Sequence, residues 1–178
     1  MPVPIVIQRP SADEHSVGVG RYLADVAGTD AWPVLAAQPA EVERLLGALS
    51  EERALHRYAP GKWSVKEVLG HLCDAERIYA YRALRFARKD ATPLPGFEED
   101  DYVPAGRFDA RLLRDLLDEW QAVRSATLAL YRGLDGDALL RRGVANGNLI
   151  SVRAMAWLAA GHALHHLGVL QARYGIVA

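Results

Sequence analysis

The sequence has little cysteine: Cys73 is the only one in 178 residues. A single cysteine cannot form a disulfide within the chain, which excludes a small disulfide-stapled secreted domain. The first seven residues lack both a basic start and an apolar run of signal-peptide length, and no uncharged apolar stretch is long enough for a membrane span. We therefore expect a cytoplasmic protein that makes no use of a membrane.

The chain also lacks an excess of charge of either sign. It carries 21 Lys and Arg against 22 Asp and Glu, a formal net charge of -1. Without a basic field, nucleic acid is excluded as an expected partner. Glycine-rich phosphate loops, CxxC pairs and Ser/His/Asp sets are missing too. With 51% hydrophobic residues, the chain can bury a core of its own, and we expect one domain over residues 1–178.

Hydrophobic residues recur at helical spacing in four long segments, and we find no convincing alternating run that calls for a sheet. The segments cover approximately residues 31–49, 64–87, 109–130 and 151–174. A further helix is expected over about 11–26, where Gly18 and Gly20 weaken the pattern. The class is all-α, and the economical arrangement is an up-down, antiparallel four-helix bundle with an additional N-terminal helical segment.

Local signals mark the ends of these helices. Asp30 is expected to cap the first, and Ser64 with Glu67 forms a capping box at the start of the second. Ser151 is expected to cap the last helix, and Gly175 to stop it. Residues 90–107, rich in proline and acidic side chains, predict a long loop without a regular element, of the kind that acts as a lid or binding loop. Residues 141–149 predict a turn region.

Two histidines, His162 and His166, lie four residues apart on one face of the last helix. His71 lies in the second turn of the helix that begins at Ser64. Three neutral imidazoles are the ligand number of a catalytic metal site that keeps one position open. The alternative is a set of hydrogen-bonded core histidines, but burying several unpaired imidazoles costs desolvation energy that metal coordination recovers. His165 points about 60° away from His162 and is not expected to be a ligand.

The ligand type limits the choice of metal. Three imidazoles without a close carboxylate suit zinc, nickel, iron or copper better than magnesium or calcium. Glu67 and Asp74 each lie about one helical turn from His71, so either could orient its ring. The alternative is that both carboxylates form surface salt bridges with neighbouring basic residues.

Other candidates for chemistry are weaker. Cys73 is interpreted as a small buried apolar residue, and the tryptophans at 63, 120 and 157 as core or interface residues. A run of cations is interpreted as a charged outer face, with an anion site for a carboxylate-bearing substrate as the alternative. The run comprises Arg77, Arg82, Arg85, Arg88 and Lys89.

In combination, these motifs resemble the DinB-like superfamily of metal-binding four-helix proteins. The resemblance rests on residues 57–67, 70–77, 93–102 and 161–170, and it extends over a core of about 22–174. It implies an up-down four-helix bundle that commonly forms homodimers. By the same resemblance, the metal ligands map to His71, His162 and His166, with His165 adjacent to them.

The superfamily contains several activities, so the fold does not decide among them. The first hypothesis is a thiol-dependent S-transferase: a divalent zinc, nickel or iron ion binds a low-molecular-weight thiol as co-substrate, and the thiolate attacks a small electrophile. The alternative enzyme is a hydrolase in which the same site activates water toward an amide or ester. A third hypothesis is a non-catalytic, stress-associated metal-binding protein. The expected partners are a small-molecule substrate and a second copy of the chain.

Overall fold

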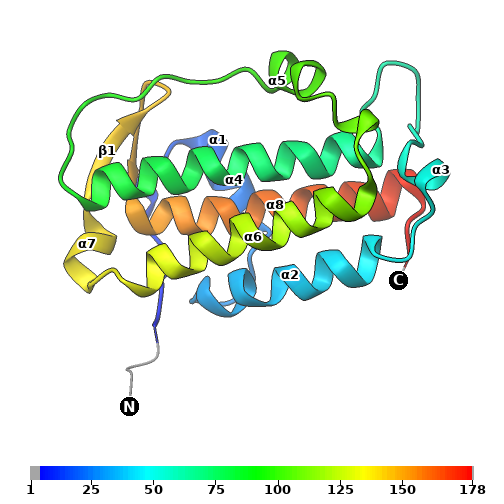
Figure 1. The fold of residues 1–178 in the computed structure, drawn as a ribbon. Helices are drawn as coiled ribbons and strands as arrows, with labels where there is room; N and C mark the ends of the chain where they lie inside the picture. The colour runs from blue at the N-terminus through cyan, green and yellow to red at the C-terminus, as the bar shows by residue number, and fades with distance from the viewer. Residues whose placement is uncertain (1–4, 178) are drawn as a thin grey trace.

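Four long helices pack side by side in the computed structural model, which describes residues 5–177 (Figure 1). They are α2 (Trp32–Leu46), α4 (Val65–Ala87), α6 (Leu113–Arg132) and α8 (Val152–Tyr174). The expected all-α class and four-helix bundle are thereby confirmed. Within the described range, none of the helices combines the length and apolar character that crossing a membrane requires.

The directions of the helices depart from the strict up-down alternation that we expected. Near the start of both helices, Lys66 of α4 donates to the carbonyl oxygen of Arg111, just before α6. Two to three turns farther along, Glu76 of α4 pairs with Arg124 of α6. These two contacts show that α4 and α6 run parallel. The parallel direction is possible because the long connection over residues 88–112 returns along the outside of the bundle (Figure 1). Helices α2 and α8 run the opposite way.

Shorter elements surround the bundle. Two 3-10 turns, η1 and η2, span Ala12–Glu14 and Phe108–Ala110. The short helices are α1 (Val17–Ala24), α3 (Glu51–Ala54), α5 (Glu99–Gly106) and α7 (Gly136–Leu140). The additional N-terminal helical segment expected over 11–26 is present as η1 followed by α1, and it covers the side of α8.

A β-hairpin replaces the turn region that we expected over residues 141–149. Strands β1 (Arg142–Ala145) and β2 (Asn148–Ser151) pair antiparallel across the turn residues Asn146 and Gly147. Both turn residues have positive φ, +50° and +72°, which is the conformation of a type I′ turn and suits an Asn-Gly pair. The expectation of no sheet was wrong here because this Asn-Gly signal was not recognised as a hairpin turn.

Helix α5 corrects a second expectation, that residues 90–107 hold no regular element. The acidic residues that we took as opposed to regular structure form the first turn of α5: Glu99, Asp100 and Asp101. Negative side chains there interact favourably with the positive end of the helix dipole. Leu94, earlier in the segment, exchanges two backbone hydrogen bonds with β1 and its turn.

The expected helix ends are found at α4 and α8. Ser64 and Glu67 form both hydrogen bonds of a capping box. The Ser151 hydroxyl accepts from the N–H of Ala154, and Gly175 ends α8 in the left-handed conformation with φ of +64°. At α2 the cap differs slightly, because Ala31 is the N-cap and Asp30 instead accepts the N–H groups of Trp32 and Ile7.

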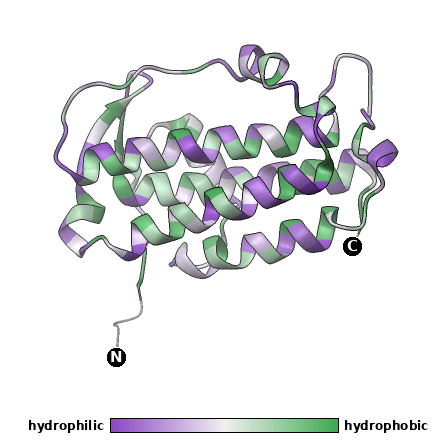
Figure 2. Cartoon of the chain, viewed as in Figure 1, coloured by the Kyte–Doolittle hydropathy of each residue, from purple (hydrophilic) through white to green (hydrophobic). Residues whose placement is uncertain are grey.

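A polar network lies among the apolar side chains at the centre of the bundle. Arg124 of α6 donates to both carboxylate oxygens of Glu76, at 2.7 and 3.1 Å. The same guanidinium donates to the side-chain oxygen of Gln38 on α2, and Gln38 in turn donates to the carbonyl oxygen of Ala160 on α8 at 2.7 Å. All four long helices are therefore joined by one buried network. Hydrophilic residues of α6, in contrast, lie on its outer face (Figure 2).

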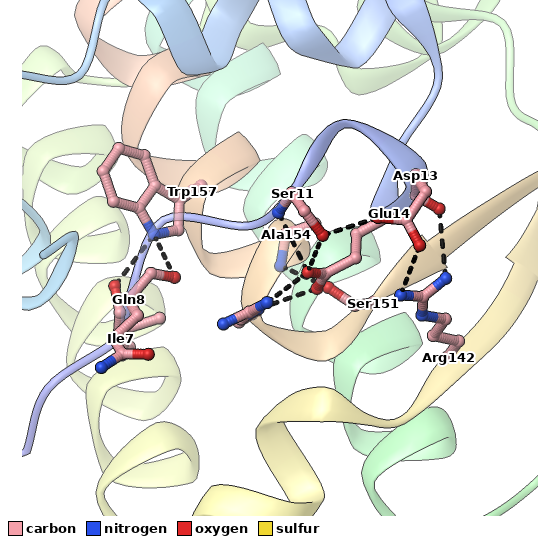
Figure 3. A network of polar contacts seen from close by, with 10 residues as sticks. Ile7, Gln8, Ser11, Asp13, Glu14, Arg142, Ser151, Ala154 and Trp157 are labelled. Carbon is pink, nitrogen blue, oxygen red and sulfur yellow. Dashed lines mark hydrogen bonds and ion pairs between the residues drawn. The ribbon is translucent and has the colours of Figure 1, made fainter. Parts of the chain in front are cut away.

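A second network fastens the N-terminal segment to α8 (Figure 3). The buried Glu14 carboxylate pairs with Arg153, and the Trp157 indole donates to the carbonyl oxygen of Ile7 at 2.9 Å. The hydrogen bond from Arg153 holds the pKa of Glu14 well below its usual range. This network fixes the chain that leads into α1.

We predict that Glu76→Gln lowers the free energy of unfolding by about 3 kcal/mol, because it leaves the buried Arg124 charge without its partner. The measurement is urea unfolding followed by circular dichroism. Glu43→Gln is the control, since Glu43 pairs with Arg114 in an exposed ion pair that we expect to contribute at most about 1 kcal/mol. Equal losses in both variants would contradict a structural role for the buried pair.

Candidate metal centre

The three histidines expected to bind a metal come together between α4 and α8. His71 lies in the second turn of α4, and His162 and His166 lie on successive turns of α8. Two glycines beside them permit close packing: a Cβ on Gly70 would lie 2.3 Å from the Phe108 ring, and one on Gly161 would lie 2.0 Å from the Tyr22 carbonyl oxygen. Each Gly-His pair therefore combines an inward imidazole with room for a neighbouring segment.

The Nε2 atoms of the three rings point at one another. His162 Nε2 lies 3.1 Å from His71 Nε2 and 3.2 Å from His166 Nε2. One candidate ligand atom from each ring lies within 4.8 Å of the others. A zinc ion with nitrogen ligands at about 2.0–2.1 Å and tetrahedral angles would separate those nitrogens by about 3.3 Å, so the spacing fits a metal ion.

Hydrogen bonds among the three imidazoles cannot satisfy all of their Nε2 atoms. The Nε2 atom of a neutral imidazole carries either one hydrogen or one lone pair, but that of His162 faces two nitrogens. A single cation accepts all three lone pairs at once. The donor chemistry of the cluster therefore fits a divalent transition metal.

Burial keeps the imidazoles neutral, as metal ligation requires. Desolvation lowers the pKa of His71 to about 4 and that of His166 to about 3. Desolvation also lowers the pKa of His162, and charge on His166 or His71 would lower it further. Their lone pairs are thus available at neutral pH without competition from protons.

The neighbours considered at the sequence level lie elsewhere. His165 is exposed and packs its ring edge-on against Tyr22, with ring centroids 5.4 Å apart. Glu67 pairs with Arg57, and Asp74 lies 3.7 Å from Arg77, so both carboxylates form surface ion pairs. The salt-bridge interpretation, which named Lys66, Arg77 or Arg82 as partners, is confirmed for Asp74, whereas the partner of Glu67 is Arg57. Among residues 5–177, no other His, Cys, Asp or Glu side chain joins the three histidines as a candidate ligand.

A cavity of about 360 Å³ opens beside the cluster and is lined in part by His71 and His162. Its size lies within the range of small-molecule sites. Most of the other lining residues come from α1, α4, the hairpin and α8, and few of them were singled out from the sequence. Those with polar groups include Tyr22, Tyr79, Arg82, Glu99 and Asn148.

Two tyrosines flank the histidines at this cavity. The rings of Tyr22 and Tyr79 lie edge-on to His162, with centroids 5.4 and 5.5 Å away. Burial raises the pKa of both phenols, so they remain protonated at neutral pH. Their hydroxyls can act as hydrogen-bond donors to a molecule in the cavity. The signal for Tyr79 in the sequence is its place eight residues after His71, but nothing local marks Tyr22.

The other side chains considered in the sequence analysis are Cys73, the tryptophans and the cationic run, and most of them have the structural roles that we expected. Cys73 is buried in the core, and desolvation raises the pKa of its thiol, in agreement with a packing role. Trp120 and Trp157 are fully buried, whereas Trp63 is partly exposed and lies against His71 with ring centroids 4.9 Å apart. Most of the cationic run is a charged outer face, as expected. Arg82 is the exception, because it is buried at the cavity wall.

The fold and the site together define a class: four-helix-bundle proteins with a buried tri-histidine cluster beside a cavity. The DinB superfamily matches residues 35–170 of the sequence, and the chain belongs to this family. The resemblance identified from the motifs is thereby confirmed. No curated protein sequence matches the chain.

Two solved structures have a similar fold. YfiT from Bacillus subtilis, described as a probable metal-dependent hydrolase with an unusual four-helix bundle topology, is 17% identical, with a TM-score of 0.73 over 95% of this chain and 94% of that one. A mycothiol-dependent maleylpyruvate isomerase is 12% identical, with a TM-score of 0.68 over 88% of this chain. The match covers 64% of the isomerase chain. At these identities the likeness concerns the fold alone.

We predict that His71→Ala, His162→Ala and His166→Ala each lower the bound metal to well below one equivalent per chain. His165→Ala is the matched control and should retain the metal, because its ring lies outside the cluster. The measurement is elemental analysis of protein purified without an affinity tag. Full metal content in any of the first three variants would remove that residue from the site.

We also predict that the metal-free protein loses stability as the pH falls from about 6.5 toward 4. The unfolded chain binds protons at histidines of ordinary pKa, about 6.5, while the folded chain does not, so acid favours unfolding. His71→Ala should reduce the slope of unfolding free energy by about 1.4 kcal/mol per pH unit in this window. Leu72→Ala, a buried packing control, should lower stability equally at each pH. An unchanged slope in His71→Ala would contradict the burial of a neutral imidazole.

Proposed function

We propose that this protein is a metal-dependent enzyme, and specifically a thiol-dependent S-transferase that acts on small electrophiles. The observation that carries the proposal is the convergence of three imidazole nitrogens, from the buried His71 and His162 and the partly buried His166, beside a small-molecule-sized cavity that His71 and His162 line. The ion is expected to be zinc, nickel or iron, held by His71, His162 and His166. A purely structural ion usually has four protein ligands, so a three-histidine set favours a site open to a reactant.

The residues around the cluster fit a transfer reaction. A divalent ion held by the histidines lowers the pKa of a bound thiol, so that the thiolate prevails near neutral pH. The thiol proton is released to solvent, the sulfur forms a bond to the electrophilic carbon, and the leaving group departs with the electron pair of its broken bond. The protonated hydroxyls of Tyr22 and Tyr79 can donate hydrogen bonds to that group as its charge develops. The cavity lining also includes apolar side chains, among them Val19, Met155 and Leu158.

The similar structures support two variants of this proposal. Dependence on mycothiol, a thiol, in the isomerase favours the thiol as the nucleophile. The description of YfiT as a probable metal-dependent hydrolase favours the alternative, in which the same histidines serve to activate water toward an amide or ester. We place the thiol first, with the cavity of about 360 Å³ beside the histidines as the space in which a small thiol would meet its electrophile.

A non-catalytic, stress-associated metal-binding protein is the third candidate, and in that role the ion would only staple α4 to α8. The cavity beside the histidines argues against it, since a staple needs no adjoining space. A small-molecule substrate, a homodimer and a cytoplasmic location stay predictions. The homodimer is tested by light scattering at micromolar concentration, where a single monomeric mass would refute it.

We predict that adding 2-mercaptoethanol to the cobalt-substituted protein changes its visible spectrum, and that thiol-dependent turnover rises with pH well below the pKa of the free thiol. The reason is that a cation lowers the pKa of a thiol bound to it. The measurements are absorption titration and turnover with a generic electrophile such as 1-chloro-2,4-dinitrobenzene. His71→Ala treated with cobalt in the same way is the control and should show neither response, because it is expected to lose the metal.

Turnover that follows the ionisation of the free thiol, or that persists after the metal is removed, would eliminate the transferase. Hydrolysis of a panel of esters and amides in the absence of thiol would then support the alternative enzyme. A cobalt spectrum indifferent to thiols, with no hydrolysis, would favour the staple.

A further inference from the structure

Arg82 is a buried cation that has no carboxylate partner within residues 5–177. Its side chain is 7% exposed, and it lies on the wall of the cavity that His71 and His162 also line. Its one hydrogen bond among the described residues runs from Nη2 to the carbonyl oxygen of Pro95, at 2.7 Å. No Asp or Glu oxygen in that part of the chain lies within salt-bridge distance of it.

Other arginines of the bundle show what burial normally requires. Arg124, which is fully buried, is paired with both oxygens of Glu76. Arg85, one turn after Arg82, faces outward and pairs with Asp90. An uncompensated charge in the interior is costly, and a guanidinium fork has several donors that one carbonyl oxygen cannot satisfy. Arg82 lines the cavity and its guanidinium carbon lies 5.9 Å from the centre of the Phe97 ring, but a single carbonyl oxygen is the only hydrogen-bond acceptor it has among the described residues.

The position of Arg82 on α4 determines the distance between its guanidinium and the histidine nitrogens. It follows His71 by eleven residues, or about three helical turns, so both side chains leave the same face of α4 roughly 16 Å apart along its axis. Allowing for the reach of the arginine side chain, the guanidinium lies on the order of 10 Å from the histidine nitrogens. The lining of the same cavity includes the apolar side chains of Ile150, Met155 and Leu158.

We propose that Arg82 binds a carboxylate of the molecule that reacts at the histidine cluster. The substrate class is then an elongated, largely apolar monoanion whose carboxylate lies about 10 Å from its reacting atom, and the Arg82 fork holds both carboxylate oxygens. This inference rests on the proposed function for what happens at the other end. The carboxylate belongs either to the thiol or to the electrophile, and the same contact serves both.

The test compares octanoate with 1-octanol by isothermal titration calorimetry, on zinc-loaded and on metal-free protein. We expect the wild type to bind the acid at least tenfold more tightly than the alcohol, in both metal states. Arg82→Gln should abolish this preference and leave the affinity for 1-octanol within about twofold, and Arg82→Lys, which keeps the charge without the fork, should fall between. Arg88→Gln removes an exposed arginine next to the end of α4 and should retain the full preference.

Two results would overturn the inference: an acid preference that survives in Arg82→Gln, or one that exists only when metal is present, because the metal would then bind the carboxylate. To find which reactant carries the carboxylate, the binding of 8-mercaptooctanoic acid and of 8-mercapto-1-octanol to the cobalt-substituted protein is compared. Tighter binding of the acid thiol, lost in Arg82→Gln, assigns the carboxylate to the thiol; equal binding assigns it to the electrophile. If neither thiol changes the cobalt spectrum while octanoate is still preferred, the transferase fails and the Arg82 site stands.

Discussion

The buried network of Glu76, Arg124, Gln38 and the Ala160 carbonyl sets the register of the four helices. Among residues 5–177, no other series of side-chain hydrogen bonds joins α2, α4, α6 and α8. Glu76 follows His71 by five residues, and Ala160 precedes His162 by two, so the network and the histidines share the same stretches of α4 and α8. A slip of one turn would displace a helix by about 5.4 Å and leave both the ion pair and the histidine cluster unmade.

The histidine cluster depends on burial in two opposing ways. Desolvation is unfavourable for charged imidazoles, and it lowers their pKa values so that neutral rings with free lone pairs prevail. Three lone pairs facing one another are in turn unfavourable without a shared partner. Burial thus makes a shared cation favourable for the facing lone pairs, and it also keeps the imidazoles neutral so that they can bind one. A metal ion that binds the folded state alone would then stabilise the bundle by mass action.

Local signals in the sequence were sufficient for the parts of the structure that local chemistry determines. The capping box at Ser64, the cap at Ser151 and the four-residue spacing of His162 and His166 all describe single helices, and the structure has them as expected. The approach of His71 to the other two depends on packing between helices; it was predicted from the ligand number of an open metal site, and the family resemblance implied the same three residues.

Features that depend on distant segments were missed. The parallel course of α4 and α6 follows from where residues 88–112 run, which no single helix encodes. Tyr22 and Glu99 reach the cavity from α1 and α5, far from the histidines in sequence. Arg82 was interpreted with its neighbours as part of an outer face, because periodicity on one helix does not show which segments cover it. The hairpin, by contrast, had a local signal in Asn146 and Gly147.

The central claim is that three imidazoles hold one metal ion and leave room for a reactant. X-ray absorption spectroscopy of the zinc-loaded protein, before and after addition of 2-mercaptoethanol, tests it most directly. The account predicts three imidazole nitrogens at about 2.0–2.1 Å in both samples and, after addition, a new sulfur neighbour at about 2.3 Å. Fewer than three imidazoles, or a shell closed by four protein ligands that no thiol enters, would contradict it.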